Sequence, residues 1–534
     1  MKEEIKMKKV ISLLLALVMS VGMLVGCGGK GGSGDKKLSI GIPQVSTVSN
    51  YEENGFTKYL EEKSGVELEF VYFSNKAAEY KQQLALTCSA QQELPDVLLG
   101  LVLDHYTMNQ YGEDGYFVDM TDYIEKYGEN FAKALTTLDG EIKEYVTEKS
   151  INTKDGATYG LPRVICTQTD DLQSMMYINQ TWLDKLGLSK PTNVEELRNV
   201  LQAFATQDPN GNGEKDELPM LGGDGIRNYL INAFVYYDPG TFNVTDGKVW
   251  DPIKTDEFRQ AMIYGNQMVK DELYSSLSFT VTASSELRNL ISPSEGPSKV
   301  GVFTGAPAGR TNAATNTISE FTALPALADA TGQGGYTVVS ERNIGWSGFI
   351  TKDCENPELA MKFMDLFYAD ETVSVQRHGV KDVDWKYFEG KNASGTESYV
   401  KTINANAFTE GDSTWCTNAL GIMTHKNYLT VADEPESERI AQIQRLLGET
   451  WDIIGNGKQA EERCIYMVYT PEEYEVREEL AGTVNEYINE EVINFFSGEK
   501  DPSNDTVWNE FLSTLDEIGR KELMDVAQSA YGRK

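Results

Sequence analysis

The first folded part of the chain alternates between strand-like and helix-like patterns, and this constrains the fold more than any other feature. Residues 37–43 alternate apolar and polar side chains as a strand does, residues 52–64 have helical spacing, and residues 66–73 alternate again. A helical segment at 77–90 and an apolar strand at 96–100 continue the pattern. Strands that alternate with helices predict a largely parallel sheet with helices on both faces, which is an α/β fold.

Two later segments carry helix-start signals. Thr192 and Glu195 have the spacing of a capping box, and the helix that they predict runs to Phe204. Asn356 before Pro357 predicts an N-cap with a proline in the first helical turn. The last quarter of the chain is dense in charge and in helical apolar spacing, so we expect it to be helical.

The charge of the chain excludes one class of partner. The 534 residues include 82 Asp and Glu against 48 Lys and Arg, so the formal net charge is −34. A surface this acidic repels the phosphates of nucleic acid. The length suggests two or three units large enough to bury a core. Six cysteines show no spacing typical of a zinc site, and five remain once Cys27 is set aside, so buried thiols are expected.

The N-terminus predicts the location of the protein. Lys6, Lys8 and Lys9 precede the apolar run 10–25, which ends at Leu24-Val-Gly-Cys27, the pattern of a signal peptide. A transmembrane anchor is the alternative, but sixteen residues are short for about 30 Å of hydrocarbon. The Leu24–Cys27 motif resembles the lipobox of bacterial lipoproteins, which implies removal of residues 1–26 and a palmitate-type lipid on Cys27. Residues 27–36 would then be a flexible, Gly-rich tether on the outer side of the cell membrane.

The sequence carries little that indicates catalysis. HExxH, phosphate-loop and GxSxG motifs are all missing; residues 345–349 come nearest to the last, but Phe349 replaces its closing glycine. The three histidines, His105, His378 and His425, lie far apart along the chain. An isolated histidine is more often a hydrogen-bonded structural residue than a catalytic one.

One short motif is chemically specific. Oxygen-bearing side chains stand at alternate positions in residues 208–217, and Gly213 permits a sharp turn, as in the first half of a calcium loop. Pro219 stands where an EF-hand has its bidentate Glu, so Asp216 and Glu217 would have to complete the ligand shell. The other reading is a solvated acidic turn. The candidate calcium ligands from the spacing are Asp208, Asn210, Asn212, Asp216 and Glu217.

Three tryptophans give a second signal. Trp346, Trp385 and Trp415 stand between glycine or polar neighbours rather than in a helical apolar pattern. Flat aromatic rings suit the apolar faces of sugar rings, so we expect these three to bind a carbohydrate. Packing in the core is the alternative for each of them.

Several segments together resemble a known family. The lipobox, residues 177–187, residues 191–219 and the later segments 299–303 and 344–360 are similar to the large carbohydrate-type extracellular solute-binding proteins of ABC importers. The resemblance covers nearly the whole chain after Cys27. It implies a two-lobed periplasmic-binding-protein-like fold of type II, with a hinge and an interlobe cleft, and a structural calcium ion in the 208–217 loop, with Glu214 contributing its carbonyl. Tyr177 joins the three tryptophans as an expected ligand-binding residue.

The resemblance also implies a division of the chain. The expected order is the first part of lobe 1, the first part of lobe 2, a return segment to lobe 1, and a helical C-terminal part that packs on lobe 2 and the hinge. These parts are residues 37–170, 171–343, 344–405 and 406–534.

The implied function is a binding subunit rather than an enzyme. We expect a monomer that captures an oligosaccharide outside the cell and delivers it to ABC permease subunits in the membrane. Two alternatives remain at this point. A secreted polysaccharide-cleaving enzyme would share the acidity and the aromatics, and a binding protein for peptides or another non-sugar solute would share the fold.

Overall fold

Residues 38–534 form two α/β lobes, each built around a sheet of its own. The computed structural model describes residues 36–534 apart from 139, 153, 166–174, 282–283, 311, 313–314, 316, 339–342, 392–396, 405–406, 429, 433–436, 465–466, 468 and 534. Cys27 and the predicted signal peptide and tether up to Asp35 therefore lie outside the described residues.

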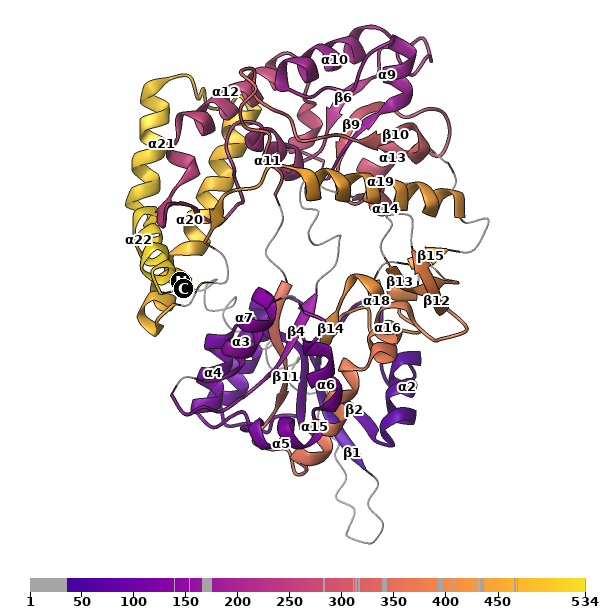
Figure 1. The fold of residues 1–534 in the computed structure, drawn as a ribbon, viewed down its shortest axis with the longest axis vertical. Coiled ribbons are helices and arrows are strands. Elements are labelled where there is room, and N and C mark those ends of the chain that lie inside the picture. The colour runs from indigo at the N-terminus through magenta and orange to yellow at the C-terminus, as the bar shows by residue number, and fades with distance from the viewer. Residues whose placement is uncertain are drawn as a thin grey trace, which may run out of the picture. The chain divides into compact units, whose positions relative to one another are not determined.

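The first lobe contains a six-stranded sheet (Figure 1). In spatial order its strands are β14 (Gly421–Met423), β4 (Leu161–Ile165), β11 (Asn343–Ile350), β3 (Val97–Leu103), β1 (Lys37–Pro43) and β2 (Glu67–Phe73). β1 runs parallel to β3, and β4 runs parallel to β14. β11 lies between β4 and β3 and is antiparallel to both.

Helices cover both faces of this sheet, as the alternating pattern predicts. Leu98 and Leu103 of β3 pack into one core, whereas Val97 and Leu99 pack into the other. The first core is closed by α3 (Ala77–Ser89) and α4 (His105–Glu113). The second is closed by α2 (Gly55–Ser64), α6 (Glu129–Leu135), α7 (Gly140–Ser150) and α15 (Pro357–Asp365), with α5 (Thr121–Tyr127) against α15.

A smaller sheet extends the first lobe. Its strands are β12 (Trp385–Lys391), β13 (Glu397–Thr402) and β15 (Thr430–Ala432). The helices α16 (Asp370–His378), α17 (Ala407–Glu410) and α18 (His425–Tyr428) belong to the same region, since α16 contacts both shorter helices and α18 contacts β13.

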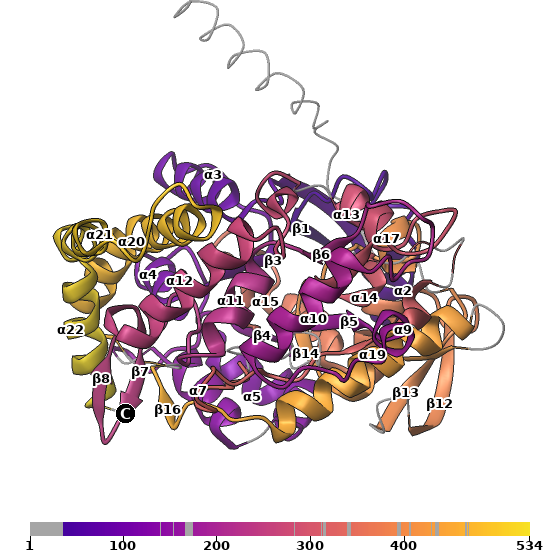
Figure 2. The same cartoon turned by 90° about the horizontal axis from the view of Figure 1, so that it is seen from above.

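The second lobe contains a four-stranded sheet and most of the C-terminal helices. In spatial order the strands are β10 (Phe321–Ala323), β5 (Met176–Asn179), β9 (Val300–Thr304) and β6 (Leu218–Leu221). One face packs against α9 (Gln180–Leu186), α10 (Val194–Thr206), α11 (Asp224–Asn232) and α12 (Asp256–Lys270), together with α20 (Pro471–Ser497), α21 (Asp505–Glu517) and α22 (Arg520–Tyr531). Figure 2 shows these last three helices lying together. The other face packs against α13 (Ser284–Ile291) and α19 (Ser437–Asn456), with α14 (Pro307–Arg310) in contact with both helices. A short sheet of β7 (Asn243–Thr245), β8 (Lys248–Trp250) and β16 (Glu462–Arg463) completes the lobe.

The helix-start signals place the predicted helices correctly, with one difference of detail. Asn356 caps α15 by accepting a hydrogen bond from the Leu359 amide, as predicted. The N-cap of α10 is Asn193 rather than Thr192, and the Glu196 carboxylate accepts from the Thr192 amide. The capping residue therefore lies one position later than the Thr192–Glu195 spacing predicts.

The expected division of the chain differs from the structure at one point. Residues 406–534 are expected to pack on lobe 2 and the hinge, but β14 pairs with β4 in the first sheet and Trp415 packs in the core of the first lobe. A three-residue strand is too short to give a readable alternation, so its sheet could not be predicted from the sequence. The helices from Ser437 onward do pack with the second lobe.

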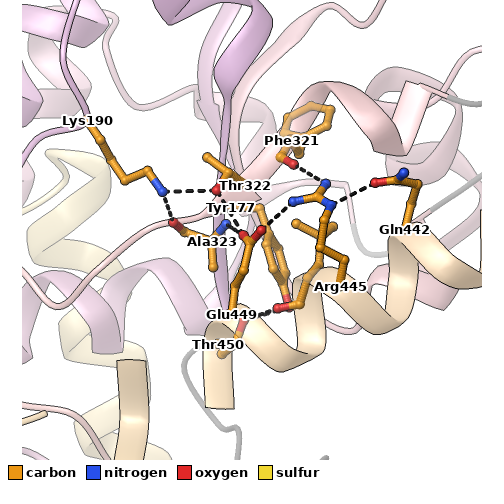
Figure 3. A network of polar contacts seen from close by, with 10 residues as sticks. Tyr177, Lys190, Phe321, Thr322, Ala323, Gln442, Arg445, Glu449 and Thr450 are labelled. Atoms are coloured by element: carbon orange, nitrogen blue, oxygen red, sulfur yellow. Dashed lines mark hydrogen bonds and ion pairs between the residues drawn. The ribbon is translucent and has the colours of Figure 1, made fainter. Parts of the chain in front are cut away.

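A polar network attaches α19 to β10, the edge strand of the second sheet (Figure 3). The Glu449 carboxylate accepts hydrogen bonds from Thr322 Oγ1 at 2.8 Å and from the Ala323 amide at 2.9 Å. Arg445 donates to Glu449 at 2.5 Å and to the Phe321 carbonyl at 2.7 Å. The network thus satisfies backbone groups that an uncovered edge strand would leave open.

Candidate ligand-binding site

The three tryptophans expected to bind sugar lie in the core of the first lobe. Trp346 is 1% exposed, and Trp385 and Trp415 are 0% exposed, so none presents a ring face to a ligand. Their indole N–H groups donate to Ser150 Oγ (2.9 Å), the Gly379 carbonyl (2.8 Å) and Thr57 Oγ1 (2.8 Å), respectively. This burial corrects the expected role: all three stabilise the fold.

The glycines beside Trp346 explain the error. Small neighbours such as glycine can leave room for the tryptophan ring to face a cavity. A Cβ built on Gly345 would instead lie 2.3 Å from Val102 Cγ1, and one on Gly348 would lie 2.9 Å from Leu420 Cδ2. These glycines allow other side chains to pack closely against β11, and they do not open a cavity.

Tyr177 is likewise a core residue of the second lobe. Its side chain is 0% exposed, and its ring lies 5.1 Å from that of Phe303. Its hydroxyl group is hydrogen-bonded to Thr450 Oγ1 at 3.2 Å (Figure 3). The expected ligand contact is therefore corrected here as well. Tyr177 fixes α19 against β5.

The 208–217 loop folds around the side chains that its sequence singled out. Asp208 accepts hydrogen bonds from the amides of Gly211 and Gly213, and Asp208 itself has a φ of 45°. The side-chain amides of Asn210 and Asn212 both donate to Asp216 Oδ1 at 3.0 Å. The loop therefore gathers three of the predicted ligands, Asn210, Asn212 and Asp216, within hydrogen-bond distance of one another.

Carboxylates and one nearby lysine set the charge of this loop. Lys299 Nζ lies 2.7 Å from Asp216 Oδ2, so a positive charge already occupies one side of the loop. Glu217 Oε1 is buried without a hydrogen-bond partner, and burial, followed by the nearby Asp208 and Asp216, raises the pKa of Glu217. Among the described residues, three or more His, Cys, Asp or Glu side chains nowhere form a metal-binding group by themselves. A cation here would therefore need the Asn210 and Asn212 oxygens and the Glu214 carbonyl.

In both sheets the carboxyl ends of the parallel strands lie beside the point where the chain leaves or enters that lobe. In the first sheet, Met423 at the end of β14 is level with Ile165, the last residue of β4. In the second, Thr304 at the end of β9 is level with Met176, the first residue of β5. Ligands of open α/β sheets bind outside such carboxyl ends. The carboxyl ends of these strands are therefore the expected position of a ligand site.

The first lobe has a cavity of about 600 Å³ at its edge, here called the lobe 1 pocket. The residues after β14 form one wall, and the end of α6 and strand β13 form others. Tyr399 of β13 lines the pocket and is 38% exposed. Thr136, Thr137 and Thr424 contribute hydroxyl groups. The pocket thus combines an accessible aromatic ring with several hydroxyl oxygens.

Asn427 lines this pocket and has a side-chain amide with an unsatisfied hydrogen-bond donor. The residue is 4% exposed, and its Oδ1 accepts from Thr424 Oγ1 at 2.9 Å. Its Nδ2 is buried and has no hydrogen-bond partner. Leaving a buried N–H unpaired costs about 1–3 kcal/mol, so a ligand oxygen that accepts from it would recover that free energy.

The second lobe has a smaller cavity of about 230 Å³, here called the lobe 2 pocket. It is lined from α11, which begins three residues after β6, and from α20. Asn228, Asn485 and Asn489 provide amide groups. Arg227 is 4% exposed and forms an ion pair with Asp224. Polar side chains thus line part of this pocket.

Neither pocket could be predicted from sequence spacing. The lobe 1 pocket joins residues from Lys133 to Asn427, and the lobe 2 pocket joins residues from Asp224 to Val492. One usable signal exists: the polar run 424–427 directly follows the apolar segment 419–423, which contains β14. Polar residues at a strand's carboxyl end are typical of a binding edge.

The chain belongs to the family of bacterial extracellular solute-binding proteins, whose pattern matches residues 44–373. It is 28% identical to the fructooligosaccharide ABC transporter substrate-binding protein FusA of Streptococcus pneumoniae over 324 residues, and this match covers 58% of this chain and 56% of FusA. That match spans about half the length of FusA. This chain is also 23% identical over 405 residues to the polygalacturonan/rhamnogalacturonan-binding protein YtcQ of Bacillus subtilis, and that match covers 73% of this chain and 76% of YtcQ.

Solved structures share the two-lobed fold. FusA of S. pneumoniae in complex with kestose superposes with a TM-score of 0.72 at 21% identity, covering 93% of this chain and 99% of FusA. A human-milk-oligosaccharide (HMO) binding protein associated with an ABC transporter of Bifidobacterium longum infantis gives 0.74 at 19% identity, with 93% and 99% covered. The predicted α/β, periplasmic-binding-protein-like fold is confirmed. None of the described helices is long and apolar enough to cross a membrane.

Proposed function

We propose that this protein is the extracellular substrate-binding subunit of an ABC transporter and that it captures an oligosaccharide for import. The observation that carries the proposal is the pocket, lined in part by hydroxyl or amide groups, that each lobe holds at the carboxyl end of a parallel strand. Hydroxyl and amide groups around a half-exposed aromatic ring suit a sugar, whose hydroxyls both donate and accept hydrogen bonds. The relatives FusA and YtcQ, which are named for carbohydrate binding, support the same class of ligand.

The alternatives predict different behaviour. Relatives in this family are binding proteins rather than enzymes. An enzyme could use histidines as proton carriers, but His105 and His378 are held neutral, because burial lowers the pKa of each to about 4. A peptide-binding protein would be stabilised by peptides and not by sugars.

A thermal-shift screen with mass spectrometry tests the proposal. The purified protein is melted with a panel of oligosaccharides and with a panel of short peptides. A ligand at 100 times its Kd adds about 2.7 kcal/mol to the free energy of unfolding, which is readily seen as a higher Tm. We expect stabilisation by an oligosaccharide that is recovered intact. Stabilisation by peptides alone, or cleavage of the glycan, would contradict the proposal.

We further propose that the 208–217 loop holds a structural calcium ion. Asp208, Asn210, Asn212, Asp216 and Glu217 would supply side-chain oxygens, and Glu214 its carbonyl. The unpartnered Glu217 Oε1 and the clustered side chains support this. One solved FusA structure is described as an EF-hand mutant, and a structure of the alginate-binding protein AlgQ2 is described as lacking calcium, so related folds have such a site.

The location and partners follow from the same proposal. Cys27 would carry a lipid that anchors the protein to the outer face of the cell membrane, and LipO of Bacillus subtilis, a relative 24% identical over 396 residues, is named as a lipoprotein. Permease subunits in the membrane would receive the sugar from a monomeric binding protein. Replacing Cys27 with Ala should release the protein into the medium, and unchanged membrane association of that variant would contradict the anchor.

A further inference from the structure

The charged residues of both pockets are balanced within the pockets themselves. In the lobe 1 pocket, Lys133 Nζ lies 3.4 Å from Asp370, and Lys426 Nζ lies 3.4 Å from Glu397. All four of these residues line the pocket. In the lobe 2 pocket, the only Lys or Arg among the described lining residues is Arg227, and it pairs with Asp224, which lines the same pocket.

This balance bears on the charge of the ligand. Proteins recognise a sugar carboxylate with a cationic side chain that is free to form a bidentate or charge-assisted hydrogen bond. Here each lining cation already faces a carboxylate, so the carboxylate of an acidic sugar would compete with Asp or Glu for that cation. A chain of net charge −34 adds long-range repulsion of a polyanion.

We infer that the ligand is a neutral oligosaccharide and that one of its sugar rings lies in the lobe 1 pocket, over Tyr399, with an oxygen accepting from Asn427 Nδ2. This inference rests on the proposed function and narrows it. It separates this protein from its relative YtcQ, whose name gives polygalacturonan, a polymer of acidic sugars, as a ligand.

The pocket is complementary to a neutral sugar in both directions of hydrogen bonding. Thr136 and Thr137 already donate their hydroxyl protons to backbone carbonyls at 2.7 Å, so their oxygens are left to accept from sugar hydroxyls. Asn427 Nδ2 supplies the opposite polarity, a donor. Tyr399 offers its ring, and Lys426 Nζ lies 5.2 Å from the centroid of that ring. A sugar ring has both the hydroxyls and the apolar face that these groups fit.

Titration calorimetry separates neutral from acidic ligands. The purified protein is titrated with neutral fructo-, gluco- and galacto-oligosaccharides and with oligogalacturonides of the same lengths, at low and high salt. We expect binding of a neutral compound with an affinity that changes less than about twofold with salt, because no counterions are released. Binding of the oligogalacturonides alone would overturn the inference and leave the carbohydrate function standing. Binding of neither class would overturn both.

Single-residue variants test whether the sugar ring lies in the lobe 1 pocket. Tyr399→Leu should weaken binding of the neutral ligand about tenfold, whereas Tyr399→Phe should retain it, because stacking needs the ring and not the hydroxyl. Asn427→Ala should weaken binding by a similar factor. Tyr387→Leu is the control, since Tyr387 is an exposed tyrosine of β12, 52% exposed, that does not line the pocket. Circular dichroism checks that each variant is folded. Equal affinity of folded Tyr399→Leu and wild type would overturn the placement in this pocket.

Discussion

Arg520 and Asp251 form a buried bidentate ion pair, with Nε donating at 2.8 Å and Nη2 at 2.9 Å to the two carboxylate oxygens. Both side chains are 2% exposed. The pair joins the first residue of α22 to the residue that caps the short helical turn at 252–254, so it fixes the C-terminal helices to the second lobe. The Arg520 guanidinium also lies 4.1 Å from the centroid of the Phe242 ring.

Breaking this pair should be strongly destabilising. Arg520→Met leaves the Asp251 carboxylate buried without its counter-charge, which costs about 3–5 kcal/mol of unfolding free energy. Urea unfolding of the variant measures the loss. The matched control is Lys521→Met, because Lys521 is the next residue and its ion pair with Asp525 is exposed to solvent. A loss for Arg520→Met no larger than that of the control would contradict the structural role of the pair.

Removing one charge from the α19 network should loosen α19. Glu449→Gln keeps the shape of the side chain but weakens its hydrogen bonds to Thr322, Ala323 and Arg445. Charge-assisted hydrogen bonds of this kind each contribute about 1.5–3 kcal/mol, so we expect a loss of that order. Hydrogen exchange should show faster exchange in residues 321–323. Unchanged exchange there would mean that β10 does not depend on Glu449.

Calcium should stabilise the protein, if the 208–217 loop holds it. Since calcium binds the folded state, removing it with a chelator should lower the Tm, and adding it back should restore the Tm. Asp208→Ala should abolish that difference. Glu195→Ala, on the exposed first turn of α10, is the control and should keep it. A chelator-treated protein that neither binds calcium nor changes its Tm would show that the loop is only a turn.

Trp346 should act through folding and not through binding. Trp346→Ala removes a fully buried ring and should cost about 3–5 kcal/mol of unfolding free energy. Trp346→Phe keeps most of the packing and loses the bond to Ser150 Oγ, at a cost of about 1 kcal/mol plus the smaller ring's lost contacts. Ligand affinity of folded Trp346→Phe should equal that of wild type. A large loss of affinity without a loss of stability would restore the binding role.

Stability should fall as the pH is lowered past the ordinary range of histidine. His378 Nε2–H donates to the Asn427 carbonyl at 2.6 Å, and burial, with a smaller effect of Arg377, lowers the pKa of His378 to about 4. The unfolded chain takes up a proton near pH 6.5, so between about 6.5 and 4 it binds more protons than the folded state. His378 therefore costs stability progressively across that window. His378→Gln should flatten the pH dependence of the Tm there, and an unchanged slope would contradict the burial of His378.

The sequence predicts those parts of the fold that depend on local pattern. The alternation in residues 37–43 and 66–73 and the N-cap at Asn356 depend on near neighbours, and the structure has β1, β2 and α15 at these places. The strand β14 has only three residues, so its place in the first sheet depends on the pairing of Met423 with Ile165, which no local pattern encodes.

The candidate site could be predicted less well from the sequence, for the same reason. Large aromatic rings such as Trp346 look alike in sequence whether they pack or bind, and only the close approach of Val102 to Gly345 decides the case. Tyr399 and Asn427 carry no motif, and the pocket that joins them to Thr136 exists only after the chain has folded. The 208–217 loop could be recognised because all its groups lie within ten residues.

A crystal structure of the protein with a bound neutral oligosaccharide tests the central claim most directly. The account predicts intact sugar in the lobe 1 pocket, with one ring against Tyr399 and a sugar oxygen within hydrogen-bond distance of Asn427 Nδ2. Sugar bound with Tyr399 and Asn427 both free of contact, or a sugar carboxylate paired with Lys133 or Lys426, would contradict it.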